Sequence, residues 1–236
     1  MKNPLDSTEN KVANIFRTQD FLLDEEELLK KYPNESDKLI NLKKIEKEII
    51  LNQLMLTRDI LDYRGNNYEG GWSIGEKRGG EKYNPPIGWI GYGLKVLDKY
   101  DNNINNNNAW IGNDNSEGEW CVAYHGIYDY YGMNKQIIRF IIYSGFRMGM
   151  HQVSEHEKDL RHLGNECGKG IYCTSDPEFA ENYANKMEIN GENYKFLLML
   201  RVNPKKIRQP ERMPKRYILN PNFDEIRPYR ILVKKC

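Results

Sequence analysis

The chain lacks an apolar run of about 18 residues, the length that a membrane-spanning helix requires. Its opening residues, MKNPLDSTENK, lack the apolar centre of a signal peptide. A strong net charge is missing too: 35 basic and 34 acidic side chains leave +1, so the chain offers no large positive field to polyphosphate. These absences predict a cytoplasmic or nuclear protein, and they favour neither a membrane nor a nucleic acid as its partner.

Cysteine pairs with metal-ligand spacing are also absent. None of the four cysteines forms a CxxC pair, and their spacing from the four histidines fits no standard zinc arrangement. The cysteines are Cys121, Cys167, Cys173 and Cys236. The sequence therefore predicts reduced thiols and no metal site.

Residues 1–65 predict a helical extension, because they are rich in Lys, Glu, Leu and Ile and poor in aromatic residues and Gly. A short helix is expected from Glu25 to Lys31, and Pro33 to Ser36 predicts a turn that leads into a second helix. Apolar residues recur along this second helix at helical spacing: Leu39, Leu42, Ile45, Ile49, Leu56 and Ile60. Such a helix either docks on a partner or packs on its own domain.

Residues 66–236 predict one α+β domain. Short β-type runs predict strands at 120–124, 196–202, 216–219 and 229–233, and helices are expected at 133–144 and 177–187. Because strands and helices mix without a regular βαβ alternation, the pattern favours α+β over a parallel doubly wound sheet. The polar run from Asp101 to Asn108 predicts a surface loop between two strands.

An imidazole is expected where the first predicted strand ends. The apolar run that begins at Glu119 ends in His125 and Gly126. A glycine lets a ligand approach the main chain closely, and a histidine donates and accepts hydrogen bonds at neutral pH. The pair indicates either a ligand contact or a histidine satisfied within a turn.

Two tyrosines flank a predicted helix start. Asp176 and Pro177 open this helix, with the proline in its first turn, and Tyr183 follows about two turns later. Tyr172 and Tyr183 can then face one cleft and form a flat slot for a planar heteroaromatic ring. Gly-Lys-Gly at 168–170 matches neither the Walker spacing nor GxGxxG, which excludes a nucleoside triphosphate site.

A third segment places an arginine after a helix. Ile141 to Ser144 predicts the helix end, Gly145 its cap, and Arg147 follows shortly after. The guanidinium of Arg147 is either a surface group or a clamp for a pyrophosphate.

Taken in order, these segments resemble the catalytic domain of the poly(ADP-ribose) polymerases, over about Trp120 to Tyr183 and more loosely in the final strand pair. The resemblance implies the split antiparallel β-sandwich of the ADP-ribosyltransferases, with NAD as co-substrate. It implies that His125 holds the nicotinamide ribose and that the Gly126 backbone binds the carboxamide. Tyr172 and Tyr183 would then sandwich the nicotinamide ring, and Arg147 would lie near the adenosine-diphosphate half.

Two positions depart from the pattern of this family. The family's catalytic Glu stands at the start of a late strand and polarises the ribose 2′-hydroxyl, but the comparable residue here is Arg216. Glu225 follows in the next turn and is the candidate for that role. Ala180 replaces a Ser that contacts the carboxamide. Members without the Glu add single units, so the resemblance implies mono-transfer or no transfer rather than polymer synthesis.

The run from His151 to His162 contains three histidines, whose spacings of five and six residues do not align on one helix face. A polar loop covering the donor site is the favoured interpretation.

These interpretations combine into one leading hypothesis, an NAD-dependent mono-ADP-ribosyltransferase acting on a protein or other macromolecule. His125, Tyr172 and Glu225 are its candidate catalytic residues. A catalytically inactive module that binds NAD, ADP-ribose or a protein is the alternative that Arg216 favours, and an NAD glycohydrolase is another.

Overall fold

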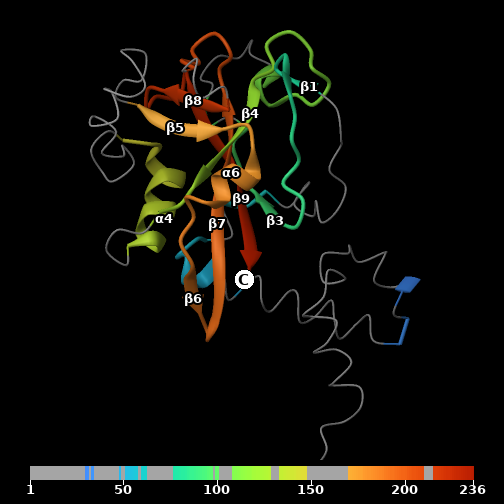
Figure 1. Ribbon diagram of the computed structural model, residues 1–236, viewed down its shortest axis with the longest axis vertical. Helices are drawn as coiled ribbons and strands as arrows, with labels where there is room; N and C mark the ends of the chain where they lie inside the picture. The colour runs from blue at the N-terminus through green and yellow to red at the C-terminus, as the bar shows by residue number, and fades with distance from the viewer. Residues whose placement is uncertain are drawn as a thin grey trace, which may run out of the picture.

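The computed structural model describes residues 30–31, 33–34, 48, 51–57, 60–62, 77–97, 99–100, 108–128, 133–147, 170–209 and 215–236. Its main sheet has the strand order β3-β9-β7-β4-β5-β8, and β6 pairs with β7 (Figure 1). The bounds are β3 (Ile90–Gly93), β4 (Cys121–Gly126), β5 (Ile171–Thr174), β6 (Met187–Ile189), β7 (Glu192–Val202), β8 (Arg216–Leu219) and β9 (Ile226–Lys235). A separate hairpin joins β1 (Lys77–Arg78) to β2 (Glu81–Lys82), and the helical segments are η3 (Ala109–Ile111), α4 (Asn134–Ser144) and α6 (Pro177–Glu181). Every strand pairing in the described part of the chain is antiparallel, which confirms the α+β class.

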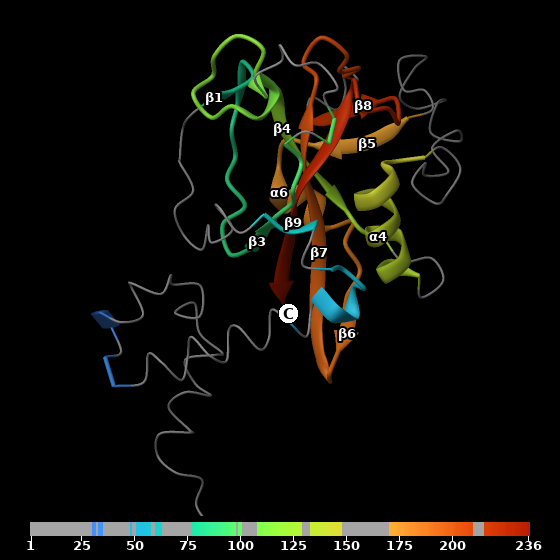
Figure 2. The same ribbon diagram turned by 180° about the vertical axis from the view of Figure 1, so that it is seen from behind.

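The main sheet consists of two parts that meet at a narrow junction. β7 pairs over most of its length with β4 and β9, and β5 pairs with β8 along all four of its residues. Between β4 and β5 there is one registered pair, Tyr124 opposite Thr174. In both views β5 and β8 run across the top of the sheet, at an angle to the long strands β7 and β9 (Figures 1 and 2). Beyond this pair, at His125 and Gly126, β4 has no registered partner in β5.

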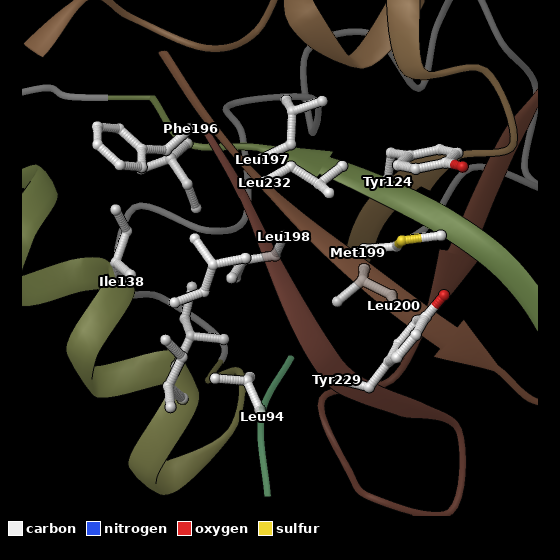
Figure 3. Close-up of a cluster of buried hydrophobic side chains, with 14 of the residues drawn as sticks. Leu94, Tyr124, Ile138, Phe196, Leu197, Leu198, Met199, Leu200, Tyr229 and Leu232 are labelled. Atoms are coloured by element: carbon white, nitrogen blue, oxygen red, sulfur yellow. The ribbon is translucent and has the colours of Figure 1, made fainter. Parts of the chain in front are cut away.

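β7 is buried on both of its faces, which explains why its sequence is almost continuously apolar. Phe196 and Leu198 face the side that is covered by Ile138 of α4, whereas Leu197 and Met199 face the side of Tyr124 (Figure 3). Because directly opposed residues of an antiparallel pair share a face, the pairing of β4 with β7 places His125 on the face of Leu198. His125 thus points toward the α4 side of the sheet.

α4 confirms the helix predicted at 133–144, and its apolar spacing explains it. Ile138, Ile141 and Ile142 are buried, and this spacing puts them on one side of the helix. The helix ends at Gly145, whose φ of 80° is a conformation that L side chains rarely adopt and whose N–H donates to the Ile141 carbonyl at 2.9 Å. The turn at Gly145 directs Phe146 back into the core, where it is 3% exposed.

α6 begins where the sequence predicts but ends early, at Glu181 instead of residue 187. Asp176 caps it by accepting hydrogen bonds from the N–H groups of Glu178 (3.0 Å) and Phe179 (3.2 Å). The chain then leaves the helix because the N–H of Asn185 donates to the carbonyl of Ile127, beyond the end of β4. From Met187 it continues as the edge strand β6.

The second predicted helix ends earlier than expected, because residues 51–53 are helical but the chain turns at Leu54 and Met55. Met55 has a φ of 53°, which a helix does not contain. Leu54, Leu56 and Leu61 are buried in the core shared with the sheet, and Leu61 forms an isolated bridge with Leu94. The apolar side chains after residue 53 thus reach the core from a turn and an extended segment.

All four predicted strands are present, and β8 has the predicted bounds. Several other predictions concern residues outside the described part of the chain: the start of the second helix at 36–47, the polar run 101–107, the loop 151–162 and the domain division at 65–66. Lys30 and Lys31, at the end of the first predicted helix, are helical. Among the described residues, no helix has the length and apolar character needed to cross a membrane.

Candidate functional site

His125 bridges the junction between β4 and β5. Its Nδ1 lies 2.8 Å from the backbone carbonyl oxygen of Tyr172. Since a carbonyl oxygen only accepts, the proton of the neutral ring resides on Nδ1 and leaves Nε2 as an acceptor. Burial lowers the pKa of His125 below its ordinary value of 6.5, although the bond to Tyr172 acts in the opposite direction. His125 is therefore a neutral, oriented imidazole at neutral pH.

Phe146 fixes the other side of this imidazole. The two ring centroids lie 5.2 Å apart with an interplanar angle of 82°, an edge-to-face contact. Gly145 positions Phe146 by ending α4 in the conformation described above. Sequence reasoning selected the Gly145-Phe146-Arg147 segment for its arginine and missed Phe146 as the support of His125. The signal in the sequence was an aromatic residue placed directly after the glycine that caps the predicted helix.

The backbone of Gly126 points toward β5. The N–H of Ile127 donates to Phe196 of β7 at 3.3 Å, and the amide groups of successive strand residues point to opposite sides. The N–H and C=O of Gly126 consequently point away from β7, past the last registered pair of β4 and β5. The end of β4 thus presents one donor and one acceptor beside the His125 ring.

α6 and the turn after it lie close against Gly126. A Cβ atom on Gly126 would lie 2.5 Å from the carbonyl oxygen of Ala180, 2.8 Å from the carbonyl carbon of Tyr183 and 2.9 Å from its Cβ. These are main-chain atoms or the first side-chain atom, so none can rotate away. Residue 126 must be glycine for α6 and the turn after it to pack this closely on β4. The same contact holds Tyr183 next to β4.

Arg216 stands at the start of β8 and binds Tyr183. Its Nη2 donates to the Tyr183 hydroxyl at 2.6 Å, and its Cζ lies 5.7 Å from the centroid of the Tyr183 ring. The same Cζ lies 5.4 Å from the ring centroid of Phe179, which stacks at a tilt on Tyr183 with a centroid distance of 5.5 Å. An arginine side chain therefore lies against Tyr183, one of the two rings of the predicted slot. The sequence placed Arg216 at the position of the family's catalytic Glu but did not predict this contact with Tyr183.

The two predicted tyrosines lie on the same face of the sheet. Thr174 pairs with both Tyr124 and Arg216, so these three side chains share a face, and Tyr172 lies two positions from Thr174 on that same face. Tyr183 comes onto this face through its bond to Arg216. Tyr183 is 40% exposed, so its ring is accessible to a ligand.

Arg147 is exposed and follows Phe146 directly. Its Cζ lies 4.7 Å from the ring centroid of Phe140, on α4. The structure thus places this guanidinium on the α4 side, next in sequence to the residue that supports His125.

Glu225 lies elsewhere, in the turn between β8 and β9. Its carboxylate accepts from the Asn220 N–H at 2.7 Å, from Asn220 Nδ2 at 2.9 Å and from Asn222 Nδ2 at 3.3 Å. Burial acts to raise the pKa of Glu225, but these hydrogen bonds outweigh it and lower the pKa below 4.5. Asn220 follows the last residue of β8, which puts it about 13 Å along the strand from Arg216 at about 3.3 Å per residue. The turn thus holds the Glu225 carboxylate beyond the end of β8, away from Arg216 at its start.

The structure therefore brings Gly126, Tyr172, Tyr183 and Arg216 to one face of the junction of β4, β5 and α6. His125 reaches the same junction from the opposite face, the one that α4 covers, and contacts the Tyr172 backbone. No group of three or more potential ligands among the described residues could hold a metal ion. No protein-family model matches the sequence, and no curated protein matches it either.

Proposed function

We propose that this chain is an NAD-dependent mono-ADP-ribosyltransferase with the split antiparallel sheet of that fold, acting on a protein or other macromolecule. The observation that carries the proposal is the end of β4, where a neutral His125 ring lies beside the outward-facing N–H and C=O of Gly126. The single registered pair between β4 and β5 supports it as well, because it leaves these groups outside the ladder.

Gly126 supplies the contact to the nicotinamide carboxamide. A primary carboxamide has one carbonyl acceptor and an NH₂ donor, and a backbone N–H next to a backbone C=O complements both. His125 Nε2 accepts a hydrogen bond from a ribose hydroxyl, since Nδ1 is already committed to the Tyr172 carbonyl. The ring of Tyr183 offers a flat apolar surface to the nicotinamide.

In the proposed reaction an acceptor nucleophile attacks the anomeric carbon of the nicotinamide ribose. The bond from this carbon to the pyridine nitrogen breaks, its electron pair stays on the nitrogen, and neutral nicotinamide leaves. The chain contributes orientation through His125, Gly126 and Tyr183, and no covalent intermediate with the protein is needed. Glu225 has no part in this scheme, because its carboxylate belongs to the β8–β9 turn.

A second candidate function is a binding module for ADP-ribosyl nucleotides without transfer, and Arg216 favours it. A cation at the start of β8 opposes the positive charge that develops on the ribose when the glycosidic bond breaks. Arg216 is held there by its hydrogen bond to Tyr183.

The test is to incubate the purified full chain with NAD labelled in nicotinamide and, separately, in adenine. Wild type is expected to release nicotinamide and to transfer the adenine label. Tyr183→Ala is expected to lower both by about five- to 150-fold, since a stacking ring contributes on the order of 1–3 kcal/mol. Tyr143→Ala is the matched control, because Tyr143 is 42% exposed and lies on α4.

The outcomes separate the two candidates. Saturable NAD or ADP-ribose binding without nicotinamide release, lost in Tyr183→Ala, would support the binding module and contradict the transferase. A folded protein that neither binds these nucleotides nor releases nicotinamide would contradict both candidate functions.

A further inference from the structure

We infer that Arg216 makes this site select ADP-ribosyl nucleotides whose terminal group is neutral or anionic over the cationic nicotinamide of NAD⁺. The inference rests on the proposed nucleotide site and names which chemical form of the nucleotide this site holds best. Its basis is the position of the Arg216 guanidinium beside the rings of Tyr183 and Phe179, and the pairing of the neighbouring carboxylates with lysines.

Arg216 lies at the hydroxyl end of the Tyr183 ring, against whose face a nicotinamide ring would stack. Its Cζ lies 5.7 Å from the Tyr183 centroid and 5.4 Å from the Phe179 centroid, distances at which a cation is attracted to the electron-rich face of a ring. The bond from Nη2 to the Tyr183 hydroxyl, at 2.6 Å, holds the guanidinium in this position. A pyridinium that stacked on Tyr183 would lie close to the like charge of this guanidinium.

None of the carboxylates at the start of α6 and along it pairs with Arg216, and the charge of Glu178 acts on the neighbouring Lys215. Asp176 Oδ2 lies 2.6 Å from Lys215 Nζ, and Asp176 Oδ1 accepts from the first amides of α6. Glu181 is paired with Lys195 and with Lys234. Arg216 itself forms no ion pair with any residue that the structure describes.

The guanidinium also has donors to spare for an anionic group. An arginine carries five N–H donors, and the Tyr183 hydroxyl accepts one of them. A hydroxyl or a charged oxygen at the end of the nucleotide can accept from the others, whereas a pyridinium ring offers no acceptor in its plane and adds a like charge. Like charges separated by about 6–9 Å in a partly exposed site weaken binding on the order of fivefold.

For the proposed transferase, this means slow turnover of NAD⁺ and tighter binding of ADP-ribose than of NAD⁺. NAD⁺ enters weakly, while ADP-ribose and the neutral reduced nucleotide NADH bind more tightly. Arg216 is therefore a specificity-determining residue, and removing its charge is expected to raise the affinity for NAD⁺.

The experiment is isothermal titration of the full chain with NAD⁺, NADH and ADP-ribose. NAD⁺ and NADH form the decisive pair, because they share every group except the charge and aromaticity of the nicotinamide ring. Wild type is expected to bind NADH at least about fivefold more tightly than NAD⁺. Arg216→Gln is expected to remove this difference by strengthening NAD⁺ binding, and Arg216→Lys to keep it.

Lys215→Gln is the control for a general loss of positive charge. Lys215 neighbours Arg216 in sequence but pairs with Asp176 and has a side chain that is 66% exposed, so its removal should leave the preference unchanged. Equal affinities of wild type for NAD⁺ and NADH, or a weaker NAD⁺ affinity in Arg216→Gln, would overturn the inference and leave the nucleotide site standing. Absence of binding of all three nucleotides would instead refute the nucleotide site itself.

Discussion

The contact between Gly126 and α6 makes the stability of the protein sensitive to a single methyl group. In Gly126→Ala the new Cβ would lie 2.5 Å from the Ala180 carbonyl oxygen, and ordinary contact begins at 3.4 Å, so the two must separate by 3.4 − 2.5 = 0.9 Å. Overpacking of this kind costs about 1–3 kcal/mol. The smaller chain entropy of alanine in the unfolded state returns about 0.4–1 kcal/mol. The expected net loss is about 1–2 kcal/mol of the free energy of unfolding.

Urea unfolding followed by tryptophan fluorescence measures this loss, as a lower midpoint at an unchanged slope. A melting temperature lowered by about 2–8 °C should accompany it for a domain of this size. Gly88→Ala is an informative control, because Gly88 has a φ of 81° and nothing within 4 Å of a Cβ, so its cost comes from the backbone alone and should leave α6 undisturbed. A Gly126→Ala protein as stable as wild type would refute the reasoning, since it would mean that α6 is free to move.

Three further predictions concern the site and its supports. Glu225→Gln should lower the free energy of unfolding by about 1–2 kcal/mol, measured by urea unfolding at pH 7. Because the folded pKa of Glu225 is lowered, the stabilisation is present above its ordinary pKa of 4.5 and is lost as the pH falls through the folded value. The stabilities of the two proteins should therefore converge in acid. Asp176→Ala should destabilise by about 1 kcal/mol through loss of the α6 cap, and Asp176→Ser, which keeps a capping oxygen, should recover most of it; equal losses in both would contradict the capping role. Burial lowers the pKa of His125, so below pH 6.5 the unfolded chain binds a proton that the folded chain does not, and the free energy of unfolding should fall as the pH drops below this value. His125→Gln should show a flatter dependence of stability on pH between pH 7 and 5. A dependence equal to that of wild type would contradict a neutral buried ring.

The elements that the sequence predicts well are those with a strong local pattern. α4 has apolar residues spaced for one buried side and a glycine at its end, and β8 is a short apolar run bounded by polar residues. α6 has a recognisable start in Asp176 and Pro177, but its end is set by the bond of Asn185 to Ile127, a contact that no local pattern contains. The left-handed turn at Met55 likewise interrupts a run whose spacing reads as helix.

The candidate site was predictable as a set of residues but not as a set of contacts. His125, Gly126 and Tyr183 stand out in the sequence by type and order. The hydrogen bond of Arg216 to Tyr183 joins residues 33 positions apart, and it depends on the way β8 lies beside β5. The position of Glu225 depends on which turn amides its carboxylate closes, which is a matter of side-chain geometry within five residues.

The narrow junction between β4 and β5 has a consequence for the order in which the protein opens. β7 is tied by ladders to β4, β6 and β9, while the β5–β8 pair joins the rest of the sheet through Tyr124 opposite Thr174 and through the His125 side chain. In hydrogen-exchange terms the amides of β5 and β8 belong to a less protected cooperative unit than those of β7 and β9. The strand that carries Tyr172 is then expected to open more readily than the central strands β7 and β9. A ligand that bridges β4 and β5 is therefore expected to slow amide exchange in β5 and β8, and to leave exchange in β7 and β9 unchanged.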